Sequence, residues 1–215
     1  MNIVLSIPSG QRTEKLINLI YKWRKVCDFK IALYTWCEQT EKDAAHMVDY
    51  FLRGELASFA VNQNFLAEYV KNIGDWDVFI CGADDLYPGY NIDKLESVCL
   101  RYPDKVIWIK DGFLNQQPTH AIITRGWYDK HGCIFDEKFK HNFCDSDLFM
   151  RAYQAQEIVK CFDISFDHRH YLKSNIKKDD IYKLGESTYA EDERYFKSKY
   201  NGVKANFNDI PEARA

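Results

Sequence analysis

The sequence of 215 residues lacks several features, and each absence excludes a class of protein. No apolar run approaches the roughly 20 residues needed to span a bilayer, and the first residues do not have the pattern of a secretory signal. The 29 lysines and arginines nearly balance the 32 aspartates and glutamates, so no large basic field drives sequence-independent binding of nucleic acid. We therefore expect a cytoplasmic protein without a transmembrane segment.

Several motifs that mark common enzyme classes are also missing. The sequence has no GxGxxG after its first strand and no GxxxxGK[ST], which argues against a dinucleotide-dependent dehydrogenase and a P-loop kinase. It has no GxSxG or HExxH motif either. The seven cysteines form an odd set without a CxxC pair, and most lie in apolar runs. We therefore expect reduced thiols rather than disulfides or a structural zinc site.

What is present predicts one α/β domain. Hydrophobic residues make up 46% of the chain, and its length fits a single core. The first half alternates short apolar runs with amphipathic stretches, which predicts βαβ units and a mostly parallel sheet flanked by helices. The expected strands are Ile3–Ile7, Lys30–Thr35, Val78–Cys81 and Val106–Ile109, and the expected helices follow Thr13 and cover Asp43–Leu52, Asn64–Ile73 and Ile92–Tyr102.

The second half breaks this alternation. Apolar runs at Ala121–Thr124 and Val159–Phe166, with a helix over Asp147–Gln154 between them, predict a mixed extension of the sheet. The sequence becomes polar from Ser174 onward, with a helix expected over Ala190–Tyr200 and frayed residues after it.

Two adjacent carboxylates follow a buried strand. Asp84 and Asp85 come just after Val78–Cys81, and the carboxyl ends of parallel strands are where open α/β sheets bind ligands. Paired aspartates at this place can hold a divalent cation, which neutralises a departing diphosphate. An aspartate-rich turn before a helix explains the same residues, and the pattern alone leaves both interpretations open.

A second acidic pair and two histidines occur later in the chain. Asp145 and Asp147 open a short helix, where a carboxylate that faces a cleft can act as a general base; helix capping explains them equally well. His168 and His170 alternate along an extended segment and so share one face, where an imidazole can complete a metal site. Surface histidines are the competing interpretation. His120 has no comparable context.

Two other segments are candidates for binding. Pro8, Ser9 and Arg12 follow the first strand and can present backbone N–H groups and a guanidinium to a nucleotide. Trp127 and Tyr128 lie between the two carboxylate motifs, where they would form an aromatic platform for an acceptor. A buried aromatic pair is the default alternative for these two residues.

Taken in order, these segments resemble the GT-A glycosyltransferases of the family 2 type. The matching stretches are Ile3–Ser9 with Arg12, Val78–Asp85 with Pro88, Gly132–Phe139, Asp145–Leu148 with Arg151, and His168 or His170. The resemblance implies a single GT-A (Rossmann-like) domain over residues 1–200, followed by a tail over 201–215. Within the domain it implies a half that binds the nucleotide sugar, about residues 1–110, and an acceptor half, about residues 111–200.

The resemblance also implies roles for individual residues. The residues it implies for donor binding are Pro8, Ser9, Arg12, Asp84 and Asp85. It implies that Asp84 and His168, with His170 as the alternative, bind a Mn²⁺ or Mg²⁺ ion, and that Asp145 is the catalytic base. The residues it implies for acceptor binding are Trp127, Tyr128 and Asp147. Three positions depart from the family pattern. Gly82 replaces the first Asp of the DxD motif, Thr35-Trp36-Cys37 replaces an Asp that contacts the base, and Cys144 replaces the Glu of a Glu-Asp pair.

The resulting hypothesis is a metal-assisted, inverting hexosyltransferase that uses a nucleotide diphosphate sugar, with a UDP-sugar favoured. Its acceptor stays open among a glycan precursor, a protein and a hydroxymethylated base of phage-type DNA. One alternative is a sugar nucleotidyltransferase, which needs a better glycine-rich basic loop than Ser9–Arg12. The other is a nucleotide-sugar-binding module without catalysis, an interpretation favoured by Gly82 and Cys144.

Overall fold

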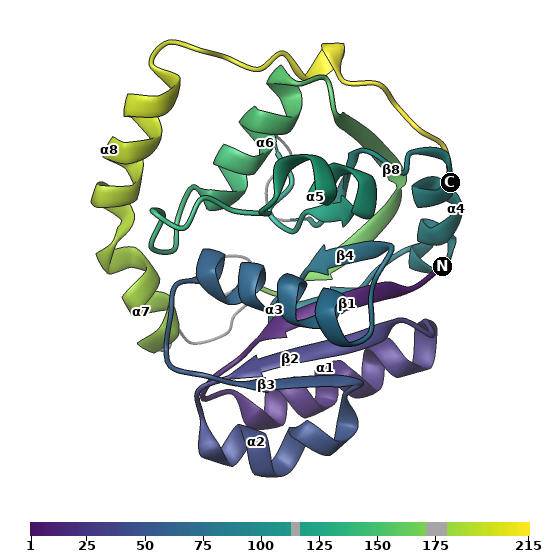
Figure 1. Cartoon of the computed structure of the whole chain (residues 1–215), viewed down its shortest axis with the longest axis vertical. Helices are drawn as coiled ribbons and strands as arrows, with labels where there is room; N and C mark the ends of the chain where they lie inside the picture. Colours follow the sequence, from purple (N-terminus) through teal and green to yellow (C-terminus); the bar gives the residue numbers. More distant parts are fainter. Residues whose placement is uncertain (113–116, 171–179) are drawn as a thin grey trace.

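The computed structural model describes residues 1–112, 117–170 and 180–215 (Figure 1). Within these residues, eight strands form one sheet in the order β3-β2-β1-β4-β7-β6-β8-β5. The strands are β1 (Ile3–Pro8), β2 (Lys30–Thr35), β3 (Tyr50–Arg53), β4 (Val78–Cys81), β5 (Leu86–Pro88), β6 (Val106–Lys110), β7 (Ile122–Thr124) and β8 (Ile158–His168).

The two halves of the sheet differ in strand direction. In the first half, β1 pairs in parallel with β2 and β4, and β2 pairs in parallel with β3. In the second half, β7 lies antiparallel between β4 and β6, β8 runs parallel to β6, and β5 runs antiparallel to β8. This arrangement confirms the expected α/β class, with a parallel first half and a mixed second half.

Helices cover both faces of the sheet. They are α1 (Thr13–Val26), α2 (Glu38–Ala44), α3 (Phe59–Ile73), α4 (Leu95–Arg101), α5 (Arg125–His131), α6 (Cys144–Gln154), α7 (Asp180–Ser187) and α8 (Tyr189–Tyr200). Because successive strand residues point to opposite faces, Val4 joins one hydrophobic core and Leu5 the other. The first core packs α3, α5 and α6 onto the sheet, and the second packs α1 and α4. Among the described residues, no helix combines the length and the apolar character required to cross a membrane.

Two expectations about local structure were wrong. The stretch Asp43–Leu52 is not one helix, because α2 ends at Ala44 and the chain then forms β3, which pairs with β2 in the register Ala32↔Tyr50. The tail is not frayed throughout, since Ile210 and Ala213 are buried and the backbone of Lys160 in β8 bonds to Pro211 and Ala213. In both cases a partner distant in sequence decides the structure, and local periodicity does not reveal such a partner.

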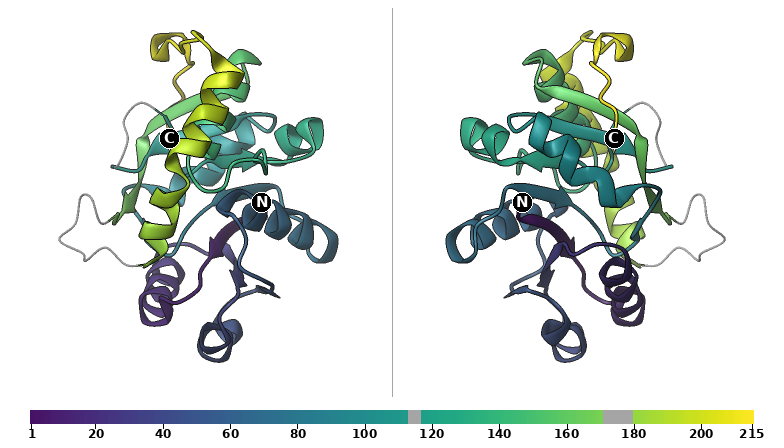
Figure 2. Two further views of the ribbon diagram at one scale, coloured as in Figure 1. Left: turned by 90° about the vertical axis from the view of Figure 1, so that its left-hand side faces the viewer. Right: turned by 90° about the vertical axis from the view of Figure 1, so that its right-hand side faces the viewer.

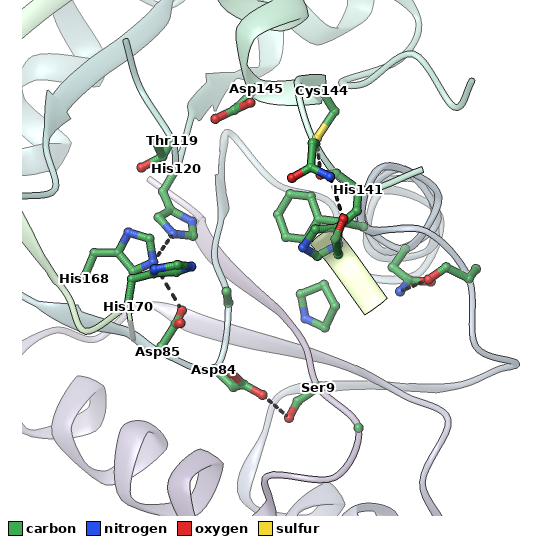
Figure 3. A pocket seen from close by; sticks show the side chains of 18 of the residues that line it. Ser9, Asp84, Asp85, Thr119, His120, His141, Cys144, Asp145, His168 and His170 are labelled. Atoms are coloured by element: carbon green, nitrogen blue, oxygen red, sulfur yellow. Dashed lines mark hydrogen bonds and ion pairs between the residues drawn. The ribbon is translucent and has the colours of Figure 1, made fainter. Parts of the chain in front are cut away.

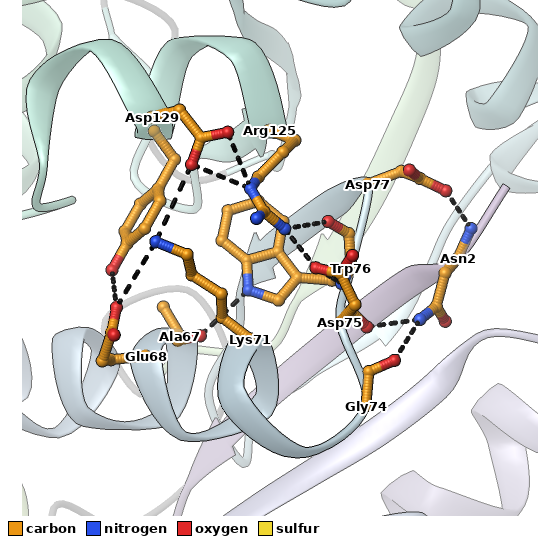
Figure 4. A network of polar contacts seen from close by, with 11 residues as sticks. Asn2, Ala67, Glu68, Lys71, Gly74, Asp75, Trp76, Asp77, Arg125 and Asp129 are labelled. Atoms are coloured by element: carbon orange, nitrogen blue, oxygen red, sulfur yellow. Dashed lines mark hydrogen bonds and ion pairs between the residues drawn. The ribbon is translucent and has the colours of Figure 1, made fainter.

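A polar network at the amino end of β4 joins the two halves of the domain (Figure 4). Arg125, at the start of α5, pairs with Asp75 just before β4 and, at 2.9 Å, with Asp129 one turn further along α5. The Asp77 carboxylate accepts a hydrogen bond of 2.6 Å from the backbone N–H of Asn2, which precedes β1. These contacts fix β4 at the end opposite to Asp84 and Asp85.

Candidate active site

A cavity of about 820 Å³ lies at the carboxyl ends of β1 and β4 (Figure 3). The loop after β1, the loop after β4, the start of α3, residues 117–120, the loop into α6, the end of β8 and α7 all contribute to its wall. The predicted residues that line it are Pro8, Ser9, Arg12, Asp84, Asp85, Asp145, His168 and His170. The sheet therefore brings together side chains that are up to 162 positions apart in the sequence, from Pro8 to His170.

Asp84 is held by the loop that follows β1. It is 4% exposed, and its two carboxylate oxygens accept hydrogen bonds from Ser9 Oγ at 2.9 Å and from Arg12 Nη1 at 2.7 Å. Burial raises the pKa of Asp84, and the neighbouring Arg12 charge opposes this shift. The predicted Ser9, Arg12 and Asp84 thus form one cluster, in which Asp84 oxygens face protein donors.

The first DxD position is a glycine for a steric reason. A Cβ atom on Gly82 would lie 2.5 Å from the backbone oxygen of Ser6, which β1 holds in place. The Gly82 carbonyl in turn accepts a hydrogen bond of 2.8 Å from Gln63 Nε2 on α3. Close packing of strand, loop and helix therefore leaves no room for a side chain at this position unless its neighbours shift.

A group with metal-ligand character forms around the second aspartate. Oxygen and nitrogen atoms of Asp85, His120 and His168 all lie within 4.8 Å of one another. His168 Nε2 is 3.5 Å from Asp85 Oδ1 and 3.5 Å from His120 Nε2. The sequence prediction paired His168 with Asp84; in the structure, His168 faces Asp85 instead, because the Asp84 side chain turns toward Ser9 and Arg12 (Figure 3).

His120 is the ligand-type residue that the sequence interpretation missed. Its Nδ1 lies 2.9 Å from the carbonyl oxygen of Cys81, a contact that a protonated Nδ1 makes as donor and that leaves the Nε2 lone pair facing His168. Cys81 also bonds through its N–H to Ala121, next to His120. This antiparallel contact between the end of β4 and the segment leading into β7 carries His120 into the site. A local pattern around residue 120 does not predict this pairing.

The two histidines of the group differ in protonation. Burial lowers the pKa of His120 to about 4. Burial also disfavours the charged form of His168, but Asp111 and Asp85 outweigh it and raise the pKa of His168 to about 9. Asp111, which the sequence analysis did not single out, follows β6, is 3% exposed and places a carboxylate oxygen 3.7 Å from His168 Nδ1. At neutral pH, His120 is therefore neutral and His168 carries a proton.

His170 lines the cavity beside this group. Its ring centroid is 5.5 Å from that of His168, and burial lowers its pKa to about 4. Among the described residues, it does not belong to the three-residue group of possible metal ligands.

Asp145 lies in the first turn of α6 and faces the same cavity. In Figure 3, Ser9 and Asp84 lie on one side of the labelled histidines His120, His168 and His170, and Asp145 lies on the other side. Burial raises its pKa to about 6, although its Oδ1 accepts the Ser146 N–H at 2.8 Å and its Oδ2 accepts Gln117 Nε2 at 3.3 Å. The preceding Cys144, which takes the place of the Glu of the family pattern, is 3% exposed. Asp145 is thus a carboxylate poised to take a proton near neutral pH.

The predicted acceptor residues lie outside the cavity. Trp127 and Tyr128 are 0% and 3% exposed and pack from α5 into the core, where the Tyr128 hydroxyl bonds to Glu68 at 2.9 Å. Asp147 is 0% exposed, pairs with Arg151 and accepts the Tyr200 hydroxyl at 2.8 Å. None of these three residues lines the cavity, so their burial gives no support to the acceptor role expected for them, which stays a prediction.

No protein-family model matches the chain, and no curated protein sequence matches it. Solved structures do match. TarS of S. aureus aligns with 97% of this chain and 46% of its own, at 12% identity and a TM-score of 0.64. The mannosyltransferase PcManGT of Pyrobaculum calidifontis, solved with GDP-Man and Mn²⁺, aligns with 78% of this chain and 56% of its own, at 8% identity and a TM-score of 0.53. The chain thus spans about half the length of these two proteins.

A third match comes from another enzyme class. CMP:2-keto-3-deoxy-manno-octonic acid synthetase, solved with CTP, aligns with 90% of this chain and all of its own length, at 10% identity and a TM-score of 0.51. At such identities the likenesses establish the fold, and the chain has the GT-A fold that the sequence resemblance implied.

Proposed function

We propose that this protein transfers a sugar from a nucleotide diphosphate sugar to a hydroxyl acceptor. The observation that carries the proposal is the composition of one cavity, which holds the Asp85-His120-His168 group and the Asp145 carboxylate. The GT-A fold shared with a mannosyltransferase that binds GDP-Man supports the same reaction class. The volume of the cavity, about 820 Å³, falls within the range of small-molecule sites.

The donor binds along the loops after β1 and β4. Pro8, Ser9 and Arg12 meet the nucleotide, and Arg12 brings a positive charge that suits a diphosphate. Two buried polar atoms in the cavity wall support a ligand there: Asn62 Oδ1 and Thr119 Oγ1 have no hydrogen-bond partner among the described residues. A UDP-sugar is the favoured donor.

Asp85, His120 and His168 would hold a divalent cation. One carboxylate and two imidazoles favour Mn²⁺ over Mg²⁺, because Mg²⁺ prefers oxygen ligands. Such a cation supplies positive charge that stabilises the departing diphosphate. This proposal replaces Asp84 with Asp85 as the acidic ligand and leaves Asp84 to order Arg12 for the donor.

Asp145 acts as the general base. It takes the proton of the acceptor hydroxyl while the hydroxyl oxygen attacks the anomeric carbon and the bond from that carbon to the diphosphate oxygen breaks. Attack opposite to the leaving group inverts the anomeric configuration. Gln117 and Ser146, which bond to Asp145 and to each other, orient the carboxylate. The acceptor remains one of the three predicted: a glycan precursor, a protein or a hydroxymethylated DNA base.

One test is a thermal-shift screen of UDP-, GDP-, CDP- and dTDP-sugars with and without Mn²⁺, followed by measurement of nucleoside diphosphate release. We expect one donor class to raise the melting temperature more strongly with Mn²⁺, because a ligand that binds the native state stabilises it. We also expect Asp145→Asn to keep this binding and lose turnover. An Asp145→Asn protein that transfers sugar at the wild-type rate would refute the role of Asp145.

The likeness to the CTP-bound synthetase favours a second candidate, a sugar nucleotidyltransferase. That reaction consumes a nucleoside triphosphate and releases pyrophosphate. Incubation with each nucleoside triphosphate and a sugar phosphate, with pyrophosphate as the readout, separates it from sugar transfer. Donor binding without turnover on any acceptor would instead favour a binding module.

A further inference from the structure

The turn that leads into Asp145 has a strained backbone. Phe143, directly before α6, has φ of 61° and lies in the left-handed region, which a bulky residue rarely adopts. Such a conformation persists only where its surroundings hold it. Since Asp145 is two residues further on, whatever holds this turn also sets the position of the carboxylate.

A single carboxylate from α8 holds the segment before this turn. Asp192 is 1% exposed, and its oxygens accept three consecutive backbone N–H groups, from Lys140 at 2.8 Å, His141 at 3.0 Å and Asn142 at 2.8 Å. Hydrogen bonds from backbone N–H groups to an ionised acceptor are among the stronger ones in proteins. The backbone on the amino-terminal side of the strained residue is therefore fixed by one side chain.

The surroundings of Asp192 complete the support. The Phe143 ring packs against Tyr189 and Phe196 of α8, at centroid distances of 5.1 and 5.5 Å. The Asn142 side chain bonds to the Gly185 carbonyl at 2.7 Å and to Thr188 Oγ1 at 3.2 Å. The left view of Figure 2 shows α8 on the outer side of the domain, so the support comes from outside the sheet that forms the rest of the site.

We propose that Asp192 is a positioning residue for the reaction: its three backbone hydrogen bonds hold the left-handed turn at Phe143 and thereby aim Asp145 into the cavity. This inference rests on the proposed function, because it takes Asp145 as the base. Asp192 itself does not line the cavity. Asp192→Asn keeps the size of the side chain but leaves only one accepting oxygen for the three backbone donors and the Thr188 hydroxyl.

The test combines a readout of the turn with a readout of turnover. In Asp192→Asn, we expect the amides of residues 140–142 to exchange hydrogen about 10-fold faster or more, because the turn opens locally. We expect hydrolysis of UDP-glucose, UDP-N-acetylglucosamine or GDP-mannose with Mn²⁺ to slow on the order of 100-fold, as for a catalytic group displaced by about 1 Å. Binding of the same nucleotide sugar should change less than about twofold, since the donor loops are untouched.

Asp136→Asn is the matched control. Asp136 also bonds to α8, through Tyr195 at 2.8 Å and Lys199 at 2.9 Å, but not to the backbone of 140–142. The Asp136→Asn variant should have a lower melting temperature, but its hydrogen exchange at residues 140–142 and its turnover should be unchanged. If Asp192→Asn does not fold, Asp192→Glu keeps the charge and should give an intermediate rate.

The outcomes separate the two proposals. Wild-type exchange and wild-type turnover in Asp192→Asn would overturn the positioning role, and so would equal losses of turnover in Asp136→Asn and Asp192→Asn. Faster exchange in Asp192→Asn, with no hydrolysis of any donor by the wild type, would count against the proposed function and not against the hold on the turn.

Discussion

The pH dependence of turnover gives a quantitative test of Asp145. Its pKa is raised from 3.8 to about 6 by burial in the cavity wall. A general base works in its ionised form, so about one tenth of the protein is competent at pH 5 and about nine tenths at pH 7. With the ordinary pKa of 3.8, about nine tenths would already be competent at pH 5.

The assay is kcat for nucleoside diphosphate release between pH 4.5 and 8.5, with donor and Mn²⁺ saturating at every pH because the imidazoles also bind protons. We expect kcat to rise about tenfold from pH 5 to its plateau, with a midpoint near pH 6. Asp145→Asn should remove both the activity and the midpoint. Asp104→Asn, at an exposed carboxylate, should reproduce the wild-type curve. A wild-type rate at pH 5 close to the plateau would refute the reasoning.

The same pKa shift has a consequence for stability. The folded protein binds the Asp145 proton more tightly than the unfolded chain, so the stabilisation is fully present below about pH 3.8 and is lost as pH rises through about 6. A shift of about two units corresponds to at most about 3 kcal/mol. Asp145→Asn should therefore gain melting temperature over the wild type at pH 8 and gain none at pH 4, as followed by circular dichroism. Equal differences at both pH values would contradict this linkage.

Three further predictions concern other parts of the site and the core. His120→Ala should weaken Mn²⁺ binding, measured by calorimetry, on the order of 10-fold or more, whereas exposed His46→Ala should not. Gly82→Ala should lower stability by about 1–3 kcal/mol, seen as a lower denaturation midpoint, because its Cβ would press on Ser6 O; an unchanged midpoint would contradict the steric account. Trp127→Phe should lower the melting temperature and leave the KM of any acceptor unchanged, since Trp127 is a core residue; a raised KM would support its predicted acceptor role.

The sequence predicted the secondary structure correctly wherever the pattern within one segment was sufficient. The stripe of Leu16, Leu19, Ile20 and Trp23 predicted α1, and all four side chains are buried. The apolar run before Asp84 predicted β4 and its strand-end carboxylates. The sequence did not predict the structure of residues 50–53 and 210–213. These residues form a strand and a docked tail only because β2 and β8 offer them backbone partners.

The candidate site shows the same division. Ser9, Arg12 and Asp84 follow strand ends, and the parallel pairing of β1 with β4 brings them together as expected. His120 and Asp111 carry no local signal, and they reach His168 only through the antiparallel insertion of β7 and the pairing of β6 with β8. The different contacts of Asp84 and Asp85 could likewise not be predicted from the sequence, because neighbouring side chains point in different directions.

The sequence by itself determined the α/β class, six of the eight strands of the described sheet and the presence of acidic residues at strand ends, because these depend on periodicity and on turn-forming residues close together. Only the tertiary structure decided which aspartate faces the histidines, why position 82 has no side chain, and which element holds the turn before Asp145. Those features depend on contacts between segments far apart in the chain. Their distances are set by the sheet and by α8, and no local pattern encodes them.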